Sequence, residues 1–277
     1  MKSIGFIDYF LNEWHADNYP AWINAQTNGE MQVKYAYGHI QPGDGLMTNE
    51  QWAEKNGVEL CATIDEVIEK SDYIVVLSPD NPEMHVELSK KALESGKPVY
   101  VDKTFSQDKA DAETIFAIAE AHNTPCFSSS ALRFSQKLQA TKGDDVTCIV
   151  STAGGPIKNY IIHQIEPICV LMGTDVDKVM FTGNMECPTW LLHFADGRTA
   201  DFRLMKGEIT FSLKINHAET TEQLNIDDDF FQDFIAAMLH FFRTGDIPVS
   251  HQDTVNIMAI REACLKSMDV PCEWVAV

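Results

Sequence analysis

Residues 71–104 read SDYIVVLSPDNPEMHVELSKKALESGKPVYVDKT, and this stretch decides the fold class. The run YIVVL at 73–77 is apolar without alternation, which is typical of a strand buried on both faces of a parallel sheet. A helix is expected over 84–95, ending at Gly96, and a second apolar run, PVYV at 98–101, follows it. A strand, a helix and a strand in this order predict a βαβ unit.

The flanking residues extend the same alternation. Before the quoted stretch, strands are expected at 3–7 and 31–37, with a short helix that starts at Pro20. Thr48 and Thr63 are suitable caps for two further helices. After the stretch, a helix over 106–122 precedes a strand over 125–128. We therefore predict an α/β domain over residues 1–130, with a doubly wound (Rossmann) parallel sheet.

The pattern changes in the second half of the chain. A helical stretch over 161–171 contains Pro167, which predicts a kink or a break. Short strands with near-regular spacing are typical of a mostly antiparallel sheet, and they are expected at 176–183, 188–197, 199–207, 209–216 and 221–227. Helices over 229–244 and 253–268 close the chain. Residues 131–277 are therefore expected to form an α+β domain with an open-faced, mostly antiparallel sheet.

Composition excludes several classes of partner. The 277 residues include 21 basic and 41 acidic side chains, a formal net charge of −20, which disfavours nucleic acid and anionic membranes. Seven cysteines are scattered without a CxxC pair, which argues against a disulfide framework or a cysteine-based zinc site and is typical of a reducing cytoplasm. The opening residues lack the apolar core of a signal peptide, and no stretch is long enough to span a membrane. We expect a cytoplasmic protein that binds small molecules.

Three motifs, met in order along the chain, resemble one enzyme family. They are the run from Pro79 through His85 to Lys103, the segment IIHQIEPICVLMG at 161–173, and the closing pair of helices over 234–267. The chain is similar to the glucose–fructose oxidoreductase and inositol dehydrogenase (Gfo/Idh/MocA) family. The resemblance implies a Rossmann domain that binds NAD or NADP, and hydride transfer to or from a sugar, polyol or related alcohol. It also implies a homodimer or homotetramer.

The resemblance assigns site residues by position. The family's catalytic lysine falls on Lys103 and its active-site histidine on His163, whereas Asn159 replaces an aspartate four residues before that histidine. A lysine or a neutral histidine can accept the proton of an alcohol near neutral pH. Thr104 stands where the family has a proline, which removes the easy route to a cis peptide bond. Cofactor contacts are expected at Ser78, Pro79, His85 and Asp102, and a substrate contact at Arg133.

The segment after the first strand departs from the family pattern. The family's G-x-G-x-x-G loop, read from Gly5, falls on GFIDYF, with Ile7 and Phe10 in glycine positions. In this register the cofactor loop comprises Gly5, Ile7, Asp8, Tyr9 and Phe10, and Asp8 adds a negative charge where a diphosphate would lie. Residues 11–19 (LNEWHADNY) are expected to form a long polar loop, in which His15 is a candidate ligand contact.

Three functions remain open at this point. The first is NAD(P)-dependent hydride transfer, with Lys103 and His163 handling proton and charge. The second is a ligand-binding or regulatory homologue without the cofactor, which the lost glycines favour. The third is a non-redox enzyme that uses the segment containing Asp8 and His15. His163 and Glu166 share one helix face, but no third ligand is evident from the spacing, and no metal site is predicted.

Overall fold

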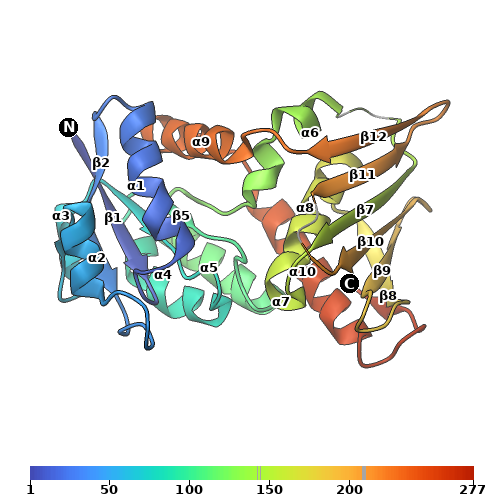
Figure 1. Ribbon diagram of the computed structural model, residues 1–277, viewed down its shortest axis with the longest axis horizontal. Coiled ribbons are helices and arrows are strands. Elements are labelled where there is room, and N and C mark those ends of the chain that lie inside the picture. Colours follow the sequence, from blue (N-terminus) through green and yellow to red (C-terminus); the bar gives the residue numbers. More distant parts are fainter. Residues whose placement is uncertain (142, 144, 208–209) are drawn as a thin grey trace. The chain divides into compact units, whose positions relative to one another are not determined.

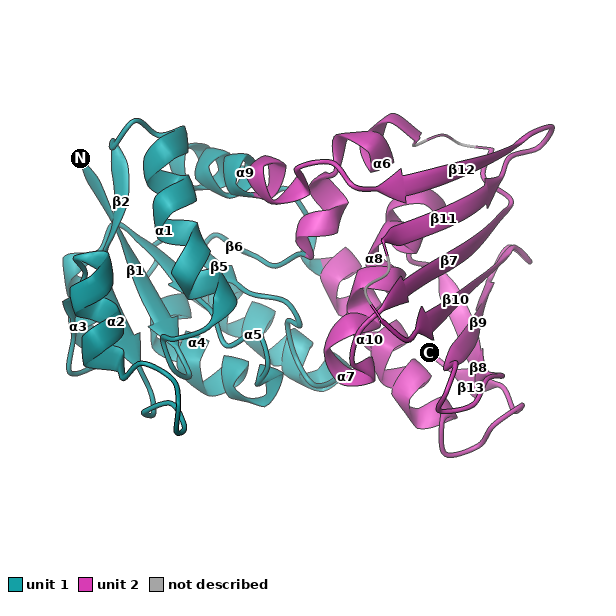
Figure 2. Cartoon of the chain, in the orientation of Figure 1, with its two compact units in different colours: residues 1–129, 235–251 teal, residues 130–234, 252–277 magenta. Residues whose placement is uncertain are grey.

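The computed structural model describes residues 1–141, 143, 145–207 and 210–277. They divide into two units (Figure 2), of which the first contains Met1–Ser129 and Ile235–His251. The second unit contains Ser130–Phe234 and Gln252–Val277. The sequence analysis divided the chain once, between residues 130 and 131, and did not anticipate that 235–251 belongs with the first unit.

The first unit is built on a parallel sheet with the strand order β3-β2-β1-β4-β5-β6 (Figure 1). Its strands are β1 (Lys2–Asp8), β2 (Met31–Gly38), β3 (Glu59–Leu60), β4 (Tyr73–Val76), β5 (Val99–Val101) and β6 (Cys126–Phe127). Its helices include α1 (Trp14–Gln26), α2 (Asn49–Asn56), α3 (Ile64–Lys70), α4 (His85–Leu93) and α5 (Lys109–Ala121), with the short η1 (Pro82–Met84) before α4. All of the strand pairs are parallel, and the predicted doubly wound fold is confirmed.

Aromatic packing explains why 235–251 belongs to the first unit. These residues form most of α9 (Phe230–Thr244) and the turn after it. The ring of Phe241 lies edge-on to Phe127 of β6, with centroids 4.9 Å apart, and Phe242 stacks on Tyr73 of β4 at 4.8 Å. Burial of such rings is a large stabilising contribution, so this late segment completes the core around the parallel sheet.

Helix α1 begins earlier than the sequence analysis predicted. It starts at Trp14, so the expected polar loop over 11–19 is wrong for its second half, and Pro20 lies inside the helix. The helix buries His15, Ala16, Tyr19 and Ile23, which recur at helical spacing. This buried face and a side-chain cap outweigh the hydrogen bond that Pro20 cannot donate. The connection from β1 to α1 is therefore short.

The second unit is built on a mostly antiparallel sheet with the order β12-β11-β7-β10-β9-β8-β13. Its strands are β7 (Cys148–Gly154), β8 (Val176–Phe181), β9 (Thr189–Phe194), β10 (Thr199–Met205), β11 (Phe211–Asn216), β12 (Thr221–Ile226) and β13 (Val275–Ala276). Only β7 and β10 pair in parallel among these described strands. The remaining elements are η2 (Ala131–Phe134), α6 (Gln136–Thr141), α7 (Ile157–Tyr160), α8 (Ile162–Met172) and α10 (His251–Ser267). The predicted α+β class is confirmed.

Two local predictions in this unit need correction. Helix α8 runs from Ile162 to Met172 through Pro167 without the predicted break, because almost all of its side chains are buried and packing holds it on every side. The short α7 precedes it as a separate turn of helix. The expected strand over 209–216 begins at a residue outside the described ones, and its described part is β11.

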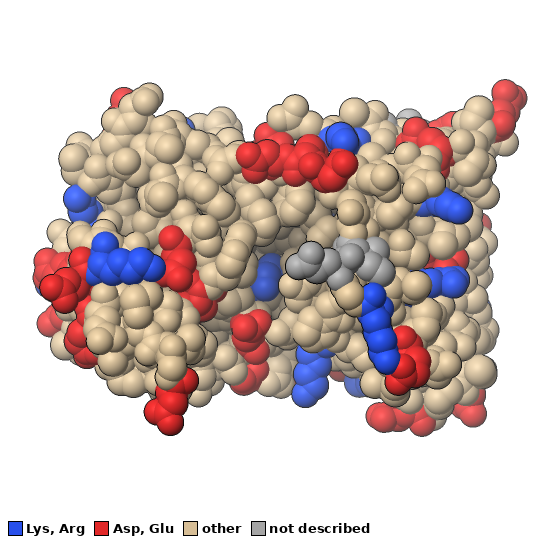
Figure 3. All heavy atoms as spheres, viewed as in Figure 1, with Lys and Arg blue, Asp and Glu red and all other residues tan. Residues whose placement is uncertain are grey.

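Basic and acidic side chains are both visible on the surface (Figure 3). On the face drawn in Figure 3, Lys and Arg side chains lie singly, interspersed with groups of acidic side chains. Within the described ranges no helix is both long and apolar enough to cross a membrane. All seven cysteines are free thiols.

Candidate active site

The carboxyl edge of the parallel sheet gathers polar side chains from three strands. Strand β1 ends at Asp8, Ser78 lies just beyond β4, and Asp102 follows β5 directly. Asp8 and Asp102 are each only 1% exposed. The strand order reverses between β1 and β4, and doubly wound sheets bind their ligands at this position. The three residues therefore lie where a ligand is expected.

Glu13 occupies the N-terminus of α1 with its own carboxylate. Its Oε2 accepts the backbone N–H of His15 at 2.8 Å, and its Oε1 accepts the backbone N–H of Ala16. At a helix N-terminus the first backbone N–H groups have no partner within the helix, and together with the helix dipole they form a site for an anion. In this chain the anion is supplied by the protein, as a side-chain cap.

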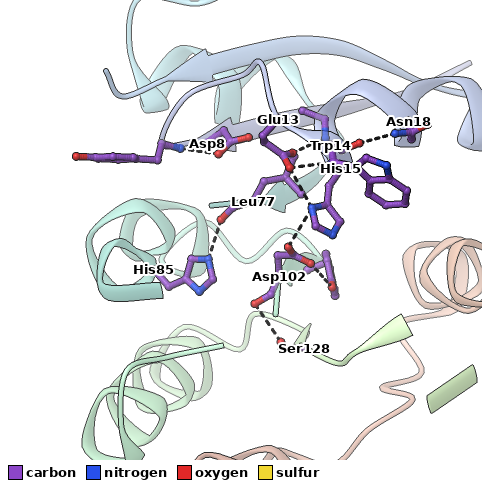
Figure 4. A network of polar contacts seen from close by, with 12 residues as sticks. Asp8, Glu13, Trp14, His15, Asn18, Leu77, His85, Asp102 and Ser128 are labelled. Carbon is purple, nitrogen blue, oxygen red and sulfur yellow. Dashed lines mark hydrogen bonds and ion pairs between the residues drawn. The ribbon is translucent and has the colours of Figure 1, made fainter. Parts of the chain in front are cut away.

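His15 is held between two carboxylates. Its Nδ1 lies 3.0 Å from Glu13 Oε2 and 3.9 Å from Asp102 Oδ2, and Figure 4 shows the ring directed from α1 toward Asp102. Burial lowers the pKa of His15, but the charge of Asp102 and the hydrogen bond with Glu13 outweigh it, so the pKa lies above its usual value. The ring packs edge-on against Trp14 and Tyr19. The buried imidazole of His15 therefore lies in surroundings that favour its protonated form.

The two aspartates each have one hydrogen-bonded oxygen. Asp8 Oδ1 accepts the N–H of Tyr9 at 2.7 Å, and Asp102 Oδ1 accepts the hydroxyl of Tyr100 at 2.8 Å. The Oδ2 atom of each is buried without a hydrogen-bond partner. Burial raises the pKa of Asp8 well above its usual value, and the charges of Glu13 and Asp102 raise it further. The site is therefore rich in acceptors and in negative charge.

The segment from β5 onward carries the predicted catalytic lysine. Lys103 is half-buried beside Asp102, and its positive charge lowers the pKa of His15 slightly. The Lys103–Thr104 peptide bond is cis, although Thr104 replaces the proline of the family pattern. Lys103, Asp102 and His15 thus belong to one group at the carboxyl edge, which the sequence analysis had listed as separate candidates.

His85 and Ser78 make hydrogen bonds to backbone carbonyls next to this edge. His85 is fully buried, with Nδ1 3.0 Å from the carbonyl of Phe105 and Nε2 2.8 Å from the carbonyl of Leu77. Burial lowers the pKa of His85, so the ring is a neutral link between the ends of β4 and β5. The Ser78 hydroxyl donates to the carbonyl of Asn81 at 3.1 Å, which fixes the turn that contains Pro79.

Gly5 and Ile7 are not loop residues, and the predicted register of the glycine loop is wrong. Both lie inside β1, where Ile7 is buried in the sheet. A Cβ on Gly5 would lie 2.4 Å from Val67 Cγ1 and Ser71 Oγ, so this glycine allows α3 to pack closely on the strand. The connection that follows β1, residues 9–13, contains no glycine.

Side chains of the connection after β1 pack against the end of β2 and the start of α2. Leu11 is fully buried, and its N–H donates to Asn49 Oδ1 at 2.9 Å. Asn49 Nδ2 donates in turn to the carbonyl of Ile40 at 2.7 Å, and Asn49 lies tightly against Gly38 at the end of β2. Tyr9 stacks on His39 beside them. Phe10 is half-buried next to Tyr9.

These observations test whether a dinucleotide fits. Its diphosphate needs a glycine turn that lets the backbone approach, together with free amides at the following helix N-terminus. Here the turn has no glycine, Glu13 takes the amides, and Asp8 adds a second acid at the end of β1. The residues present do not fit a dinucleotide diphosphate.

A second polar group lies in the second unit around the predicted His163. His163 Nδ1 lies 2.8 Å from Ser130 Oγ, and the Ser130 N–H donates to Glu166 Oε2 at 2.8 Å. The other oxygen of Glu166 accepts Arg133 Nε at 2.6 Å. His163 and Arg133 are thus brought together through two residues. Asn159 lies on the separate short helix α7.

Metal chemistry finds no support in this group. Glu166 is committed to Ser130 and Arg133, and His193 pairs with Asp177 at 2.6 Å. Within the part of the chain that the structure describes, no three His, Cys, Asp or Glu side chains are arranged to hold a metal ion.

Sequence reasoning missed Glu13, Tyr19 and Ser130. Glu13 stands directly before Trp14 and His15, but the late start assigned to α1 hid its position at the helix N-terminus. Tyr19 is buried one helical turn after His15. Burial raises the pKa of Tyr19 well above its usual value, and the charges of Asp102 and Glu13 raise it further. Ser130 carries no sequence signal, because its partner lies on another element.

Comparison with known proteins gives the family. The family model GFO_IDH_MocA, described as an oxidoreductase family with an NAD-binding Rossmann fold, matches residues 44–130. Residues 44–130 match the Gfo/Idh/MocA family. The predicted family is confirmed over this stretch, which contains Ser78, His85 and Lys103. It begins after β1, α1 and β2, the elements that carry or pack against Glu13 and Asp8.

One curated relative and many solved structures are similar to the chain. An uncharacterized oxidoreductase, YhhX of Escherichia coli K12, is 34% identical over 64 residues, which is 23% of this chain and 19% of that protein. Myo-inositol 2-dehydrogenase from Lactobacillus plantarum superposes with a TM-score of 0.82 at 15% identity, covering 100% of this chain and 99% of that one. Scyllo-inositol dehydrogenase from Lactobacillus casei, solved with NAD(H) and scyllo-inositol, gives 0.79 at 16% over 100% and 99%. At these identities the structures establish a shared fold.

Proposed function

We propose that the protein acts on a small carbohydrate-like hydroxyl compound by proton transfer at the carboxyl edge of the parallel sheet, without a dinucleotide. The observation that carries this proposal is the Glu13 carboxylate at the N-terminus of α1, where a diphosphate would otherwise lie. The same carboxylate holds the ring of His15. One residue thus closes the cofactor position and orients an acid–base group.

The residues at this edge have complementary roles. His15, with its raised pKa, is the proton-transferring group, and Asp102 balances its charge from 3.9 Å. The Lys103 ammonium is suited to stabilise negative charge that develops on a substrate oxygen. The sugar or polyol class is supported by the names of the structural neighbours, which are inositol dehydrogenases.

NAD(P)-dependent hydride transfer is the second candidate. It is favoured by the family match over residues 44–130, which includes Lys103, and by neighbours that were solved with NAD or NAD(H). In that case Lys103 and His163 would handle proton and charge, while Ser78, Pro79, His85 and Asp102 would line the cofactor. Binding of a nicotinamide nucleotide separates this candidate from the first.

Assembly and location belong to the proposal as well. We infer a homodimer or homotetramer, supported by the broad sheet of the second unit, whose helices gather on one face (Figure 2). Free thiols at all seven cysteines support a reducing cytoplasm.

Nucleotide-free turnover tests the proposed function. The purified protein is incubated with a panel of hexoses, pentoses and inositols, and loss of each compound is followed by proton NMR. A compound that is converted is then tested with His15→Ala and Lys103→Ala. We expect His15→Ala to lower the rate about 100-fold or more, as for a lost general acid or base.

His122→Ala is the matched control, since His122 is exposed on the same unit and its Nδ1 lies 3.0 Å from the carbonyl of Ile118 in the preceding helix. Its rate should equal that of the wild type. Turnover that survives His15→Ala, or turnover that requires added NAD(P), would contradict the proposal.

A further inference from the structure

Three buried side-chain oxygens at the carboxyl edge have no hydrogen-bond partner in the part of the chain that the structure describes. Among the described residues, Asp8 Oδ2, Asp102 Oδ2 and Thr104 Oγ1 are buried without a hydrogen-bond partner. All three stand at the ends of β1 and β5. A buried polar atom without a partner costs about 1–3 kcal/mol, so native proteins generally leave one only where something else supplies the contact. These atoms therefore point to a ligand that donates hydrogen bonds.

The charges around these atoms specify the donor further. Three buried or half-buried carboxylates, those of Asp8, Glu13 and Asp102, face one another near His15 and Lys103. Asp102 Oδ2 points toward these charged side chains, since it lies 3.9 Å from His15 Nδ1. Burial and, after it, the charges of Glu13 and Asp102 raise the pKa of Asp8, and a bound cation would lower it again. A neutral hydroxyl would relieve less of the repulsion between these carboxylates than a cation.

A metal ion is not the suitable cation. A metal ion prefers several oxygen ligands at set distances, and among the described residues no three His, Cys, Asp or Glu side chains are arranged to hold one. An ammonium group, by contrast, needs only acceptors that it can reach with its three N–H donors. Two carboxylate oxygens and a threonine hydroxyl meet that need.

We propose that the ligand of this edge is a hydroxylated compound with a protonated amine, of the amino sugar or aminocyclitol class, whose ammonium group pairs with Asp8 and Asp102. The inference rests on the proposed function for the choice of site. Ligand hydroxyls are then available to Thr104 and Lys103.

The experiment compares an amine with its neutral counterparts. Glucosamine, glucose and N-acetylglucosamine are titrated calorimetrically into the whole protein at neutral pH. We expect glucosamine to bind about tenfold or more tightly than either neutral sugar. Ion pairing also lowers the pKa of Asp8, so glucosamine binding should release protons, measured as a heat that changes with the ionisation enthalpy of the buffer.

Variants decide whether the named carboxylates are responsible. Asp8→Asn should abolish the preference for the amine and the proton release, and Asp102→Asn should weaken the preference independently. Asp44→Asn, at an exposed aspartate of the same unit, is the matched control and should bind as the wild type does. Circular dichroism verifies that each variant is folded.

Three results would overturn the inference: equal affinity for glucosamine and glucose, no saturable glucosamine binding, or a preference that survives both substitutions. None of these depends on turnover. Binding of NADH, or turnover that survives His15→Ala, would instead count against the proposed function. The glucosamine titration would still decide whether the amine is preferred.

Discussion

At the scale of single residues, Asp8 is a buried carboxyl group. It stands at the end of β1 with one carboxyl oxygen bonded to the Tyr9 amide and the other without a partner. A carboxyl group whose pKa is raised in the folded state binds its proton more tightly there than in the unfolded chain. Its stabilising contribution is complete below the unfolded pKa of about 4 and is lost as pH rises through the folded value.

Asp8→Asn should therefore stabilise the protein in a pH-dependent way. Asparagine keeps the acceptor for the Tyr9 amide and cannot ionise, so the variant avoids the buried charge. We expect its free energy of unfolding to match that of the wild type near pH 4 and to exceed it by about 1–3 kcal/mol at pH 8. Urea unfolding at several pH values measures this difference.

Asp44→Asn again serves as the control, and its stability should follow the wild type at every pH. Parallel curves for Asp8→Asn and the wild type would show that Asp8 carries no buried charge at neutral pH.

At the scale of elements, helix α1 separates what sequence could predict from what it could not. The apolar runs of β4 and β5 and the caps Thr48 and Thr63 are local signals, and the structure confirms the strands and both caps. The start of α1 depends on burial of His15 and its neighbours against the sheet, which no local pattern reports. Pro20 therefore misled the prediction.

In the candidate site, too, the sequence predicted the individual residues but not their arrangement. Asp102, Lys103 and His15 were found as separate candidates, because each stands at a strand end or in a polar segment. Their grouping depends on the strand order, and the role of Glu13 depends on where α1 begins. Gly5 was misassigned because a glycine that admits a neighbouring helix looks, in sequence, like a glycine of a phosphate loop.

Removing the cap should loosen α1. Glu13→Ala leaves the amides of His15 and Ala16 without their acceptor, so the unfolding free energy should fall by about 0.5–2 kcal/mol. Hydrogen exchange of these two amides should speed up as well. Chemical denaturation and exchange measured by mass spectrometry test both effects.

Glu13→Ser provides the informative control, because serine is a good N-cap and carries no charge; it should recover most of the lost stability. Glu54→Ala, an exposed position of α2, should change stability by less than about 0.5 kcal/mol. Equal stability of Glu13→Ala and the wild type would mean that the cap contributes nothing.

At the scale of the whole molecule, the family match covers only part of the chain. The family model matches 44–130, whereas β1, α1 and their connection stand outside the match and carry the acidic residues. The fold is shared over the full chain with inositol dehydrogenases at 15–16% identity. The architecture is thus shared, and the connection after β1, where a diphosphate would lie, carries Asp8 and Glu13 at its two ends and contains no glycine.

Calorimetric titration of the wild-type protein with NAD⁺, NADH, NADP⁺ and NADPH tests the central claim most directly. Because Glu13 and Asp8 take the diphosphate position, we expect no saturable heat from any of the four nucleotides up to about 1 mM. Binding of one of them with a Kd of about 10 μM or tighter would contradict the account.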